Sequence, residues 1–257
     1  MHQEPIDCIP LGQAGFRLCF GALTIYIDPY LSNSVEEAEG PALRRLVPIW
    51  KAPHLVKDAD WVFLTHGHMD HCDVDTLVPL SRASGQCRFV GPRDVGEVLA
   101  AQGIAATRFV HATHNWFPLG EDLRVHPVVA AHPEIEIDPQ GNSRFVGYVV
   151  EYRARRIYHS GDTLLNATVL KAVQSFKPID VAILPVNERN HYREARGIIG
   201  NMSVREAFQF AVDLQVGALV PMHWDMFAPN SVYPEEIEAY YRLAQPPFRM
   251  LLNPTQI

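Results

Sequence analysis

The chain has 257 residues, of which 47% are apolar and 20% are charged, and this composition predicts a globular protein with a large core. The formal net charge of −7 argues against a long nucleic acid as a partner, although a local basic pocket would be compatible with it. No apolar stretch is long enough to span a bilayer, so we expect no membrane partner.

The four cysteines form no C-x-x-C pair and show no disulfide-framework spacing, so reduced thiols are expected. The first residues lack the apolar run of a signal peptide. Both observations predict a cytoplasmic protein. No linker, low-complexity stretch or internal repeat divides the sequence, and residues 1–257 are therefore expected to form a single domain.

The predicted elements alternate between β-rich runs and amphipathic helices, which is typical of layered α/β proteins. Gly21 lies between the first two runs and suits a tight hairpin. Residues 35–56, rich in proline and charge, predict an irregular surface excursion. Ser203 and Glu206 form a capping-box pattern on a helix that we expect Gly217 to end. In chain order, the expected strands are 16–20, 23–28, 61–65, 123–132, 144–152, 155–162, 180–186 and 218–224, and the expected helices are 73–84, 92–104, 166–178, 202–217 and 234–244.

The stretch THGHMDHCD, at 65–73, carries three histidines and two aspartates in nine positions. Neutral imidazoles bind divalent metals well, and Asp70 adds a hard oxygen ligand. Four candidate ligands within six residues of loop cannot all reach one ion comfortably. The pattern therefore predicts two adjacent metals, an arrangement that clamps both the attacking and the leaving oxygen of a hydrolysed bond.

The remaining ligands are expected where other apolar strands end. The strand at 61–65 runs into His66, and three later strands run into His132, Asp162 and His223. Sites in α/β sheets lie beyond the carboxyl ends of strands, where loops converge. These side chains are therefore expected to meet at one edge of the structure.

A dense group of histidines and carboxylates marks a functional site far more often than a single histidine does. An isolated histidine is usually a surface residue or a satisfied core residue. We apply this ordinary interpretation to His2, His54, His111, His114, His126 and His191, and take His159 as a residue that packs near the site or supports it.

The motif T-H-x-H-x-D-H after a buried strand resembles the signature of the metallo-β-lactamase superfamily. Further stretches extend the resemblance over almost the whole chain, among them GQAGFRLCF near the start, then IYHSGDT and VPMHWDMF. Together they resemble the branch that contains L-ascorbate-6-phosphate lactonase. The resemblance implies a four-layer αββα sandwich with the metal site at one edge.

The same resemblance divides seven candidate ligands between two adjacent sites. Asp70 and Asp162 are also the candidate catalytic residues, because either could orient the attacking water. The implied cofactor is Zn²⁺ or Mn²⁺, as one or two ions. Asp28 would support a ligand or would be a plain turn residue. The implied sites are His66, His68 and His132 for one ion, Asp70, His71 and His223 for the other, and Asp162 between them.

Three functions are compatible with this site. The first is hydrolysis of a small anionic lactone, such as L-ascorbate 6-phosphate, by metal-activated water. The second keeps the site but hydrolyses a phosphodiester in a small cyclic or oligonucleotide substrate. The third is a metal-dependent binding protein without turnover, against which the complete ligand set argues. We expect the lactonase, and a homo-oligomer is compatible with the sequence.

The loop NERNHYREARGIIGNM, at 187–202, follows the strand at 180–186 and should lie on the metal edge. Guanidinium groups bind phosphate or carboxylate through two parallel hydrogen bonds. The alternative is that the arginines only pair with Glu188 and Glu194 on a solvated turn. The candidate substrate-binding residues are Arg189, Tyr192, Arg193, Arg196 and Asn201.

Overall fold

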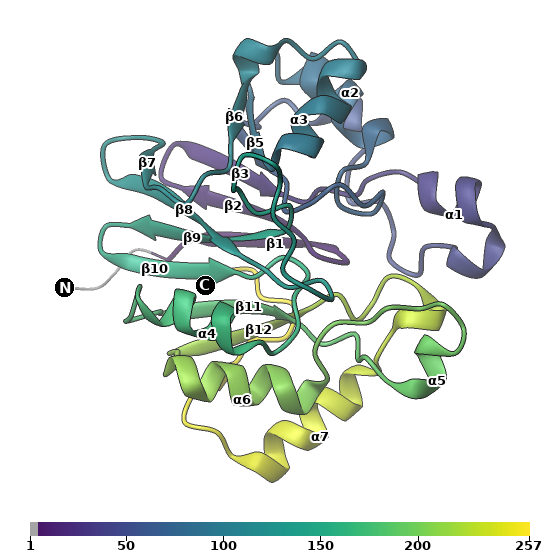
Figure 1. Cartoon of the computed structure of the whole chain (residues 1–257), viewed down its shortest axis with the longest axis vertical. Helices are drawn as coiled ribbons and strands as arrows, with labels where there is room; N and C mark the ends of the chain where they lie inside the picture. The colour runs from purple at the N-terminus through teal and green to yellow at the C-terminus, as the bar shows by residue number, and fades with distance from the viewer. Residues whose placement is uncertain (1–4) are drawn as a thin grey trace.

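Two β-sheets lie face to face at the centre of the structure, a computed structural model that describes residues 5–257 (Figure 1). The first sheet is antiparallel from β1 to β3 and parallel from β3 to β6. Its strands, in spatial order, are β1 (Asp7–Gly12), β2 (Gly15–Phe20), β3 (Leu23–Ile27), β4 (Trp61–Phe63), β5 (Arg88–Gly91) and β6 (Phe109–His111).

The second sheet is antiparallel from β7 to β10 and parallel from β10 to β13. The parallel part directs the carboxyl ends of β10, β11 and β12 to one edge. Its spatial order is β13 (Arg249–Met250), β12 (Ala218–Met222), β11 (Val181–Pro185), β10 (Arg155–His159), β9 (Val146–Tyr152), β8 (Leu123–Val129) and β7 (Phe117–Pro118).

Helices cover the outer faces of the two sheets (Figure 1). Of the helices in the described residues, α2 (Val74–Ala83) and α3 (Arg93–Ala101) lie on the first sheet, and α4 (Ala167–Gln174), α6 (Val204–Leu214) and α7 (Pro234–Ala244) on the second. The short helices α1 (Ser34–Glu39) and α5 (His191–Glu194) lie in loops. This arrangement confirms the predicted four-layer αββα sandwich.

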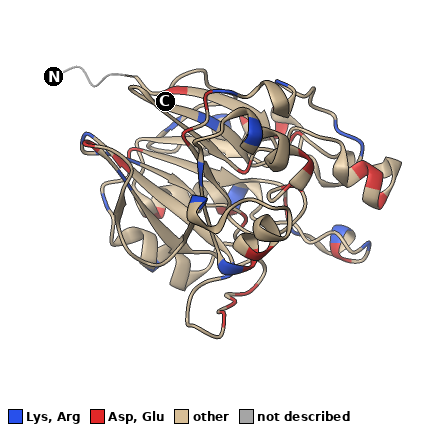
Figure 2. Ribbon diagram, turned by 90° about the horizontal axis from the view of Figure 1, so that it is seen from above, with Lys and Arg blue, Asp and Glu red and all other residues tan. Residues whose placement is uncertain are grey.

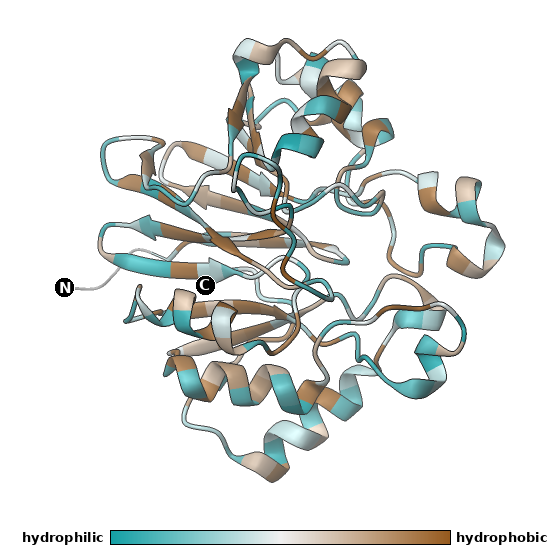
Figure 3. Cartoon of the chain, viewed as in Figure 1, coloured by the Kyte–Doolittle hydropathy of each residue, from teal (hydrophilic) through white to brown (hydrophobic). Residues whose placement is uncertain are grey.

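Each boundary between layers is filled by its own cluster of buried apolar side chains. One cluster lies between the sheets, one between the first sheet and α2 and α3, and one between the second sheet and its helices. Hydropathy follows this pattern, because the apolar residues concentrate on the strands and on the inner sides of the helices (Figure 3). No helix in the described part of the chain combines the length and the apolar character that a membrane crossing requires.

Most expected elements form, with ends that differ by a few residues. The capping box of Ser203 and Glu206 is confirmed at the start of α6. The predicted end of that helix at Gly217 is wrong, because Gln215 adopts a left-handed conformation with φ of 58° and ends the helix earlier. The excursion at 35–56 is about half irregular, and the rest is most of α1 and two short 3-10 helices, Pro41–Leu43 and Pro53–Leu55. Strands β1, β5, β6, β7 and β13 were not expected. Apart from β1 they have two to four residues, and runs that short carry little periodicity.

The last residues of the chain pair with the start of β1. Ile6 N–H donates to Ile257 O at 3.0 Å, and Ile257 N–H donates to Ile6 O at 3.0 Å. The outer edge of the first sheet is therefore covered here by the last residues of the sequence.

Two hydrogen bonds join the sheets where β4 runs into the histidine motif. The buried hydroxyl of Tyr148, on β9, donates to Leu64 O at 2.7 Å, and Val146 N–H donates to Thr65 O at 3.0 Å. Because Leu64 and Thr65 directly precede His66, these bonds fix the point from which the motif leaves the first sheet.

Replacing Tyr148 with phenylalanine should lower the free energy of unfolding by about 0.5–1.5 kcal/mol, because a buried hydrogen bond between the sheets is lost. Chemical denaturation measures this change. Tyr158→Phe is the matched control, since that hydroxyl is equally buried but has no hydrogen-bond partner among the described residues. It should be neutral or stabilising. Equal destabilisation by both substitutions would contradict the assigned role of the Tyr148 hydroxyl.

Candidate metal centre

The seven predicted ligands lie in four loops that each follow a strand. His66, His68, Asp70 and His71 follow β4, while the others follow β8, β10 and β12. The ligand atoms within each of three groups lie within 4.8 Å of one another. The groups are His66, His68 and His132, called the first group here; Asp70, His71 and His223, called the second group; and His66, His71 and Asp162.

Asp162 lies where the two groups meet. Its Oδ2 is 3.2 Å from His223 Nε2, 3.6 Å from His71 Nε2 and 3.6 Å from His132 Nε2. One carboxylate oxygen is therefore close to imidazoles from both groups, so Asp162 would help to hold an ion in either of them. The structure thus brings together all seven residues predicted from the sequence.

The first group is held by ring contacts. His66 Nε2 lies 2.9 Å from His68 Nδ1. The ring of Phe145 packs against the rings of His66, His68 and His132, at centroid distances of 5.3, 5.9 and 5.6 Å. Phe145 therefore forms an aromatic wall that restricts the orientation of all three imidazoles.

Asp28, fully buried, orients His71 in the second group. Its Oδ2 lies 2.8 Å from His71 Nδ1 and accepts from Thr65 Oγ1 at 2.6 Å, while its Oδ1 accepts from Thr65 N–H at 2.8 Å. A carboxylate only accepts, so His71 Nδ1 carries the proton and Nε2 faces the second group. Of the two roles considered for Asp28, the contacts favour support of a ligand.

Asp28 and His223 adopt left-handed backbone conformations, which residues other than glycine rarely adopt. Asp28 has φ of 42° and His223 has φ of 62°. Such conformations cost energy and persist where surrounding contacts over-determine them. Here they turn a carboxylate and an imidazole toward the site directly after β3 and β12.

Charge within the site is balanced between imidazoles and carboxylates. Burial alone would lower the pKa of His71, but the surrounding carboxylates, Asp162 first, raise it well above its usual value. Burial would raise the pKa of Asp162, yet His223 and His71 hold it well below its usual range. In contrast, burial lowers the pKa of His66 well below its usual value, which favours the neutral imidazole. A metal would therefore compete with protons at the second group.

These residues fit a divalent cation. His71 Nε2 and Asp162 Oδ1 are buried and have no hydrogen-bond partner among the described residues. Because buried polar atoms are normally paired, these two unpaired atoms indicate a site where a cation would bind. Imidazole nitrogens together with carboxylate oxygens form a ligand set that zinc, manganese and iron all accept.

The other described histidines belong to none of the potential metal-binding groups. His159 is buried, and its Nε2 lies 2.9 Å from Ala14 O while its Nδ1 accepts from Gly161 N–H at 3.1 Å, which agrees with a packing role. His2 lies outside the described residues. The potential metal-binding groups found among the described residues contain none of five further histidines, namely His54, His111, His114, His126 and His191.

The arginines of the 187–202 loop make contacts within the protein. Arg193 donates to the backbone carbonyls of Asn187, Glu188 and Ser231. Arg189 pairs with Glu194, as the alternative interpretation expects for one of the three arginines.

Arg196 lies over the exposed ring of Tyr192, at 3.6 Å from its centroid, and donates to the carbonyl of the same residue. Asn201 is fully buried and its side-chain amide has no partner within the described residues. No contact joins these five residues to the metal ligands among the described interactions, so their role in substrate binding stays a prediction.

Sequence reasoning missed three residues that touch the ligands: Gln13, Thr65 and Phe145. Gln13 Nε2 donates to Asp70 Oδ2 at 2.6 Å. Thr65 belongs to the quoted motif, so its position next to His66 was a usable signal. Gln13 lies in the quoted stretch GQAGFRLCF. Neither Gln13 nor Phe145 has a local spacing that points to the site, because each reaches it from a distant part of the chain.

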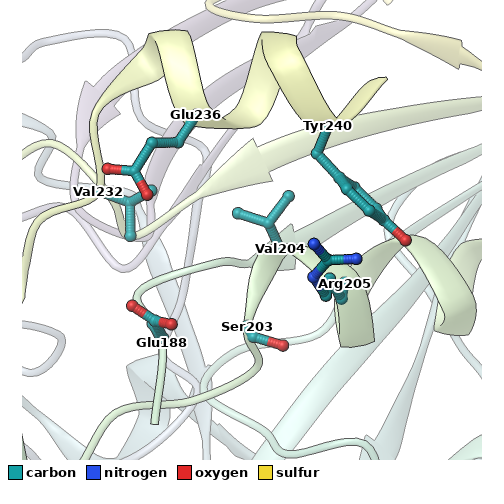
Figure 4. Close-up of a pocket in the computed structure, with 7 residues that line it drawn as sticks. All are labelled: Glu188, Ser203, Val204, Arg205, Val232, Glu236 and Tyr240. Carbon is teal, nitrogen blue, oxygen red and sulfur yellow. The ribbon is translucent and has the colours of Figure 1, made fainter. Parts of the chain in front are cut away.

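A separate cavity of about 180 Å³ lies between α7 and the start of α6. Figure 4 shows Glu188, Arg205, Glu236 and Tyr240 around it, and none of the seven candidate ligands lines it. The guanidinium of Arg205 stacks on Tyr240, at 4.7 Å from the ring centroid. The cavity is therefore distinct from the metal centre.

Replacing Asp28 with asparagine should weaken metal binding by about 10–100-fold, the usual effect of losing a residue that orients a ligand. The amide cannot accept all three hydrogen bonds that Asp28 accepts. Calorimetric titration with Zn²⁺ measures the change. Asp58→Asn is the control, because Asp58 accepts bonds from Arg17 and Tyr26 away from the ligands. Unchanged Zn²⁺ affinity in Asp28→Asn would show that His71 does not depend on this carboxylate.

Comparison with known proteins agrees with this geometry. A family model described as the beta-lactamase superfamily domain matches residues 24–224. The UPF0173 metal-dependent hydrolases of Thermococcus onnurineus and Pyrococcus furiosus are 27% and 29% identical to this chain over 230 and 234 residues. Each alignment covers 89% of this chain and 88% of the relative.

Solved structures share the fold at low sequence identity. Igni18, a metallo hydrolase from Ignicoccus hospitalis, superimposes with a TM-score of 0.74 at 19% identity, covering 99% of this chain and 97% of the other. The isothiocyanate hydrolase from Delia radicum gut bacteria gives a TM-score of 0.74 at 18% identity over the same shares. The metallo-β-lactamase fold implied by the motif is thereby confirmed. The matched family region includes all seven candidate ligands. Because the family model covers most of the chain, the chain belongs to the beta-lactamase superfamily.

Proposed function

We propose that the chain is a lactonase, a metal-dependent hydrolase that opens a small cyclic ester. The observation that carries the proposal is the convergence of both ligand groups on Asp162, next to an open groove that His68 lines. Zn²⁺ or Mn²⁺ would be held by one or both groups, because imidazole and carboxylate ligands suit either ion.

A divalent metal held by these groups would supply an activated water and polarise the substrate carbonyl. The side chains hold the ligand geometry and handle protons. The side chain of Asp162 is only 5% exposed and contacts three imidazoles, so its main part is to hold the centre together. The side chain of Asp70 is 20% exposed. It can therefore contact a water that enters from solvent and accept a proton from it during attack.

A groove of about 650 Å³ beside His68 offers space for the rest of the substrate. It lies between the metal-binding loop and α1, and Met69, Ala38 and Val74 are among its lining residues. Met69 is 41% exposed, so its apolar side chain is accessible to a molecule in the groove. This lining favours an apolar substituent on the lactone.

The charges around this groove are acidic. Exposed Glu37 and Asp75 line it, and its described lining residues include no lysine or arginine. Figure 2 shows further acidic residues on α1, which forms one side of the groove. Like charges repel, so this rim disfavours a phosphorylated substrate.

The hypothesis of a phosphorylated sugar-acid lactone, such as L-ascorbate 6-phosphate, depended on the arginines of the 187–202 loop. Their contacts with Glu194, Tyr192 and backbone carbonyls do not support it. We therefore propose an uncharged lactone with an apolar substituent as the preferred substrate class, with phosphorylated lactones as weaker substrates.

A phosphodiesterase is the second candidate, because two adjacent ligand groups suit a displacement at phosphorus. The acidic rim of the groove argues against it for the same electrostatic reason as above. A binding protein without turnover is the third candidate, and the convergence of all seven ligands argues against it.

Protein loaded with Zn²⁺ or Mn²⁺ should hydrolyse short lactones. Asp70→Ala should reduce kcat/KM by about 100-fold or more, because the change removes a ligand and a proton acceptor together. Acid release at constant pH measures turnover. Glu238→Ala, which removes an exposed carboxylate from α7, is the control and should leave turnover unchanged. Hydrolysis of a model phosphodiester, with no turnover of any lactone, would favour the second candidate instead.

A matched pair of lactones, one with an apolar side chain and one phosphorylated, tests the proposed substrate class. The apolar lactone should have the higher kcat/KM, and Met69→Asp should lower that value by about tenfold, the scale of a lost apolar contact in a pocket. Arg196→Ala should change both substrates by the same factor. Preference for the phosphorylated lactone, lost in Arg196→Ala, would instead restore the anion-binding role of the loop.

A further inference from the structure

The turn between β1 and β2 carries a residue that contacts the second group from outside. Gln13 is only 4% exposed, and its backbone is left-handed with φ of 58°. Its side-chain Nε2 donates to Asp70 Oδ2 at 2.6 Å. Because an ionised carboxylate accepts hydrogen bonds and cannot donate them, the amide nitrogen must face it. The side chain of Gln13 therefore restricts rotation of the Asp70 carboxylate.

The backbone of this turn is fixed to the same site. His223 N–H donates to Gln13 O at 2.7 Å, and Gln13 N–H donates to Asp225 Oδ1 at 2.9 Å. Buried His159 contacts the next carbonyl, that of Ala14, at 2.9 Å. Gln13 thus links Asp70 and His223, two members of the second group that are far apart in the sequence.

We propose that Gln13 is a positioning residue for the metal ion held by the second group. Asp70 Oδ2 lies 3.5 Å from His71 Nε2 and 3.8 Å from His223 Nε2. Rotation of the carboxylate would move this oxygen out of the group, and the Gln13 amide opposes that rotation.

The effect is selective between the two ions. Among the described residues, the hydrogen bonds of Gln13 reach Asp70, His223 and Asp225, and none reaches the first group. Gln13 therefore supports the second ion and leaves the first unaffected. This inference concerns metal binding and does not depend on which substrate the protein hydrolyses.

Two substitutions test this role. Gln13→Leu and Gln13→Met remove the donor and keep a side chain of similar size, and Met also keeps the unbranched chain. Calorimetric titration with Zn²⁺, with bound metal counted by elemental analysis, should show the first ion unchanged. The second ion should bind about 10–100-fold more weakly. Unchanged first-ion binding also reports that the variants are folded.

Gln209→Leu is the matched control, because Gln209 also donates to an aspartate, Asp213 Oδ1 at 2.8 Å, but on the exposed face of α6. It should leave both ions unchanged. The proposal is overturned if the Gln13 variants bind the second ion like the wild type, or lose both ions equally. A wild-type protein that binds a single ion, with an affinity that neither variant changes, overturns it as well.

Discussion

The centre of this protein depends on the compensation of buried carboxylate charge. Asp28 and Asp162 are almost fully removed from solvent, and a carboxylate in that environment is strongly unfavourable unless it is paired and hydrogen-bonded. His71 contacts both, and Thr65 completes the coordination of Asp28 by hydrogen bonds. Neither His71 Nε2 nor Asp162 Oδ1 has a hydrogen-bond partner among the described residues, and a divalent cation would satisfy both.

The two sheets provide the rigid frame that this charge balance needs. Ligands follow β4 in the first sheet and β8, β10 and β12 in the second, so the site would be lost if the sheets shifted relative to one another. Tyr148 and Val146 bond the second sheet to the residues directly before His66. Phe145, which directly precedes Val146, packs on His66 of the first group. Residues 145–148, at the start of β9, thus both hold the two sheets together and contact the candidate ligands.

The ligands could be predicted from the sequence because two local signals coincide: an apolar strand, and a histidine or aspartate directly after it. The alternation of elements predicted a layered α/β sandwich, and the resemblance carried by the motif implied its four layers. Gln13 could not be predicted, since its partner Asp70 lies in another loop and a glutamine in a turn has no characteristic spacing. The contacts of the arginines could not be predicted from the sequence either. Sequence places Arg193 in a loop, but only the folded loop shows that backbone carbonyls take up its donors.

Strand β1 runs from the residues that pair with Ile257 to the turn that contacts the candidate metal centre. Its carboxyl end leads into Gln13 at the metal centre, and its amino end follows Ile6, which is paired with Ile257. Six residues of strand extend about 20 Å at ~3.3 Å per residue. An affinity tag, a fluorescent fusion or a solid support joined to the carboxyl terminus would thus be attached at the far end of this strand. Immobilisation through that residue should leave the edge that carries the candidate metal centre open to solvent.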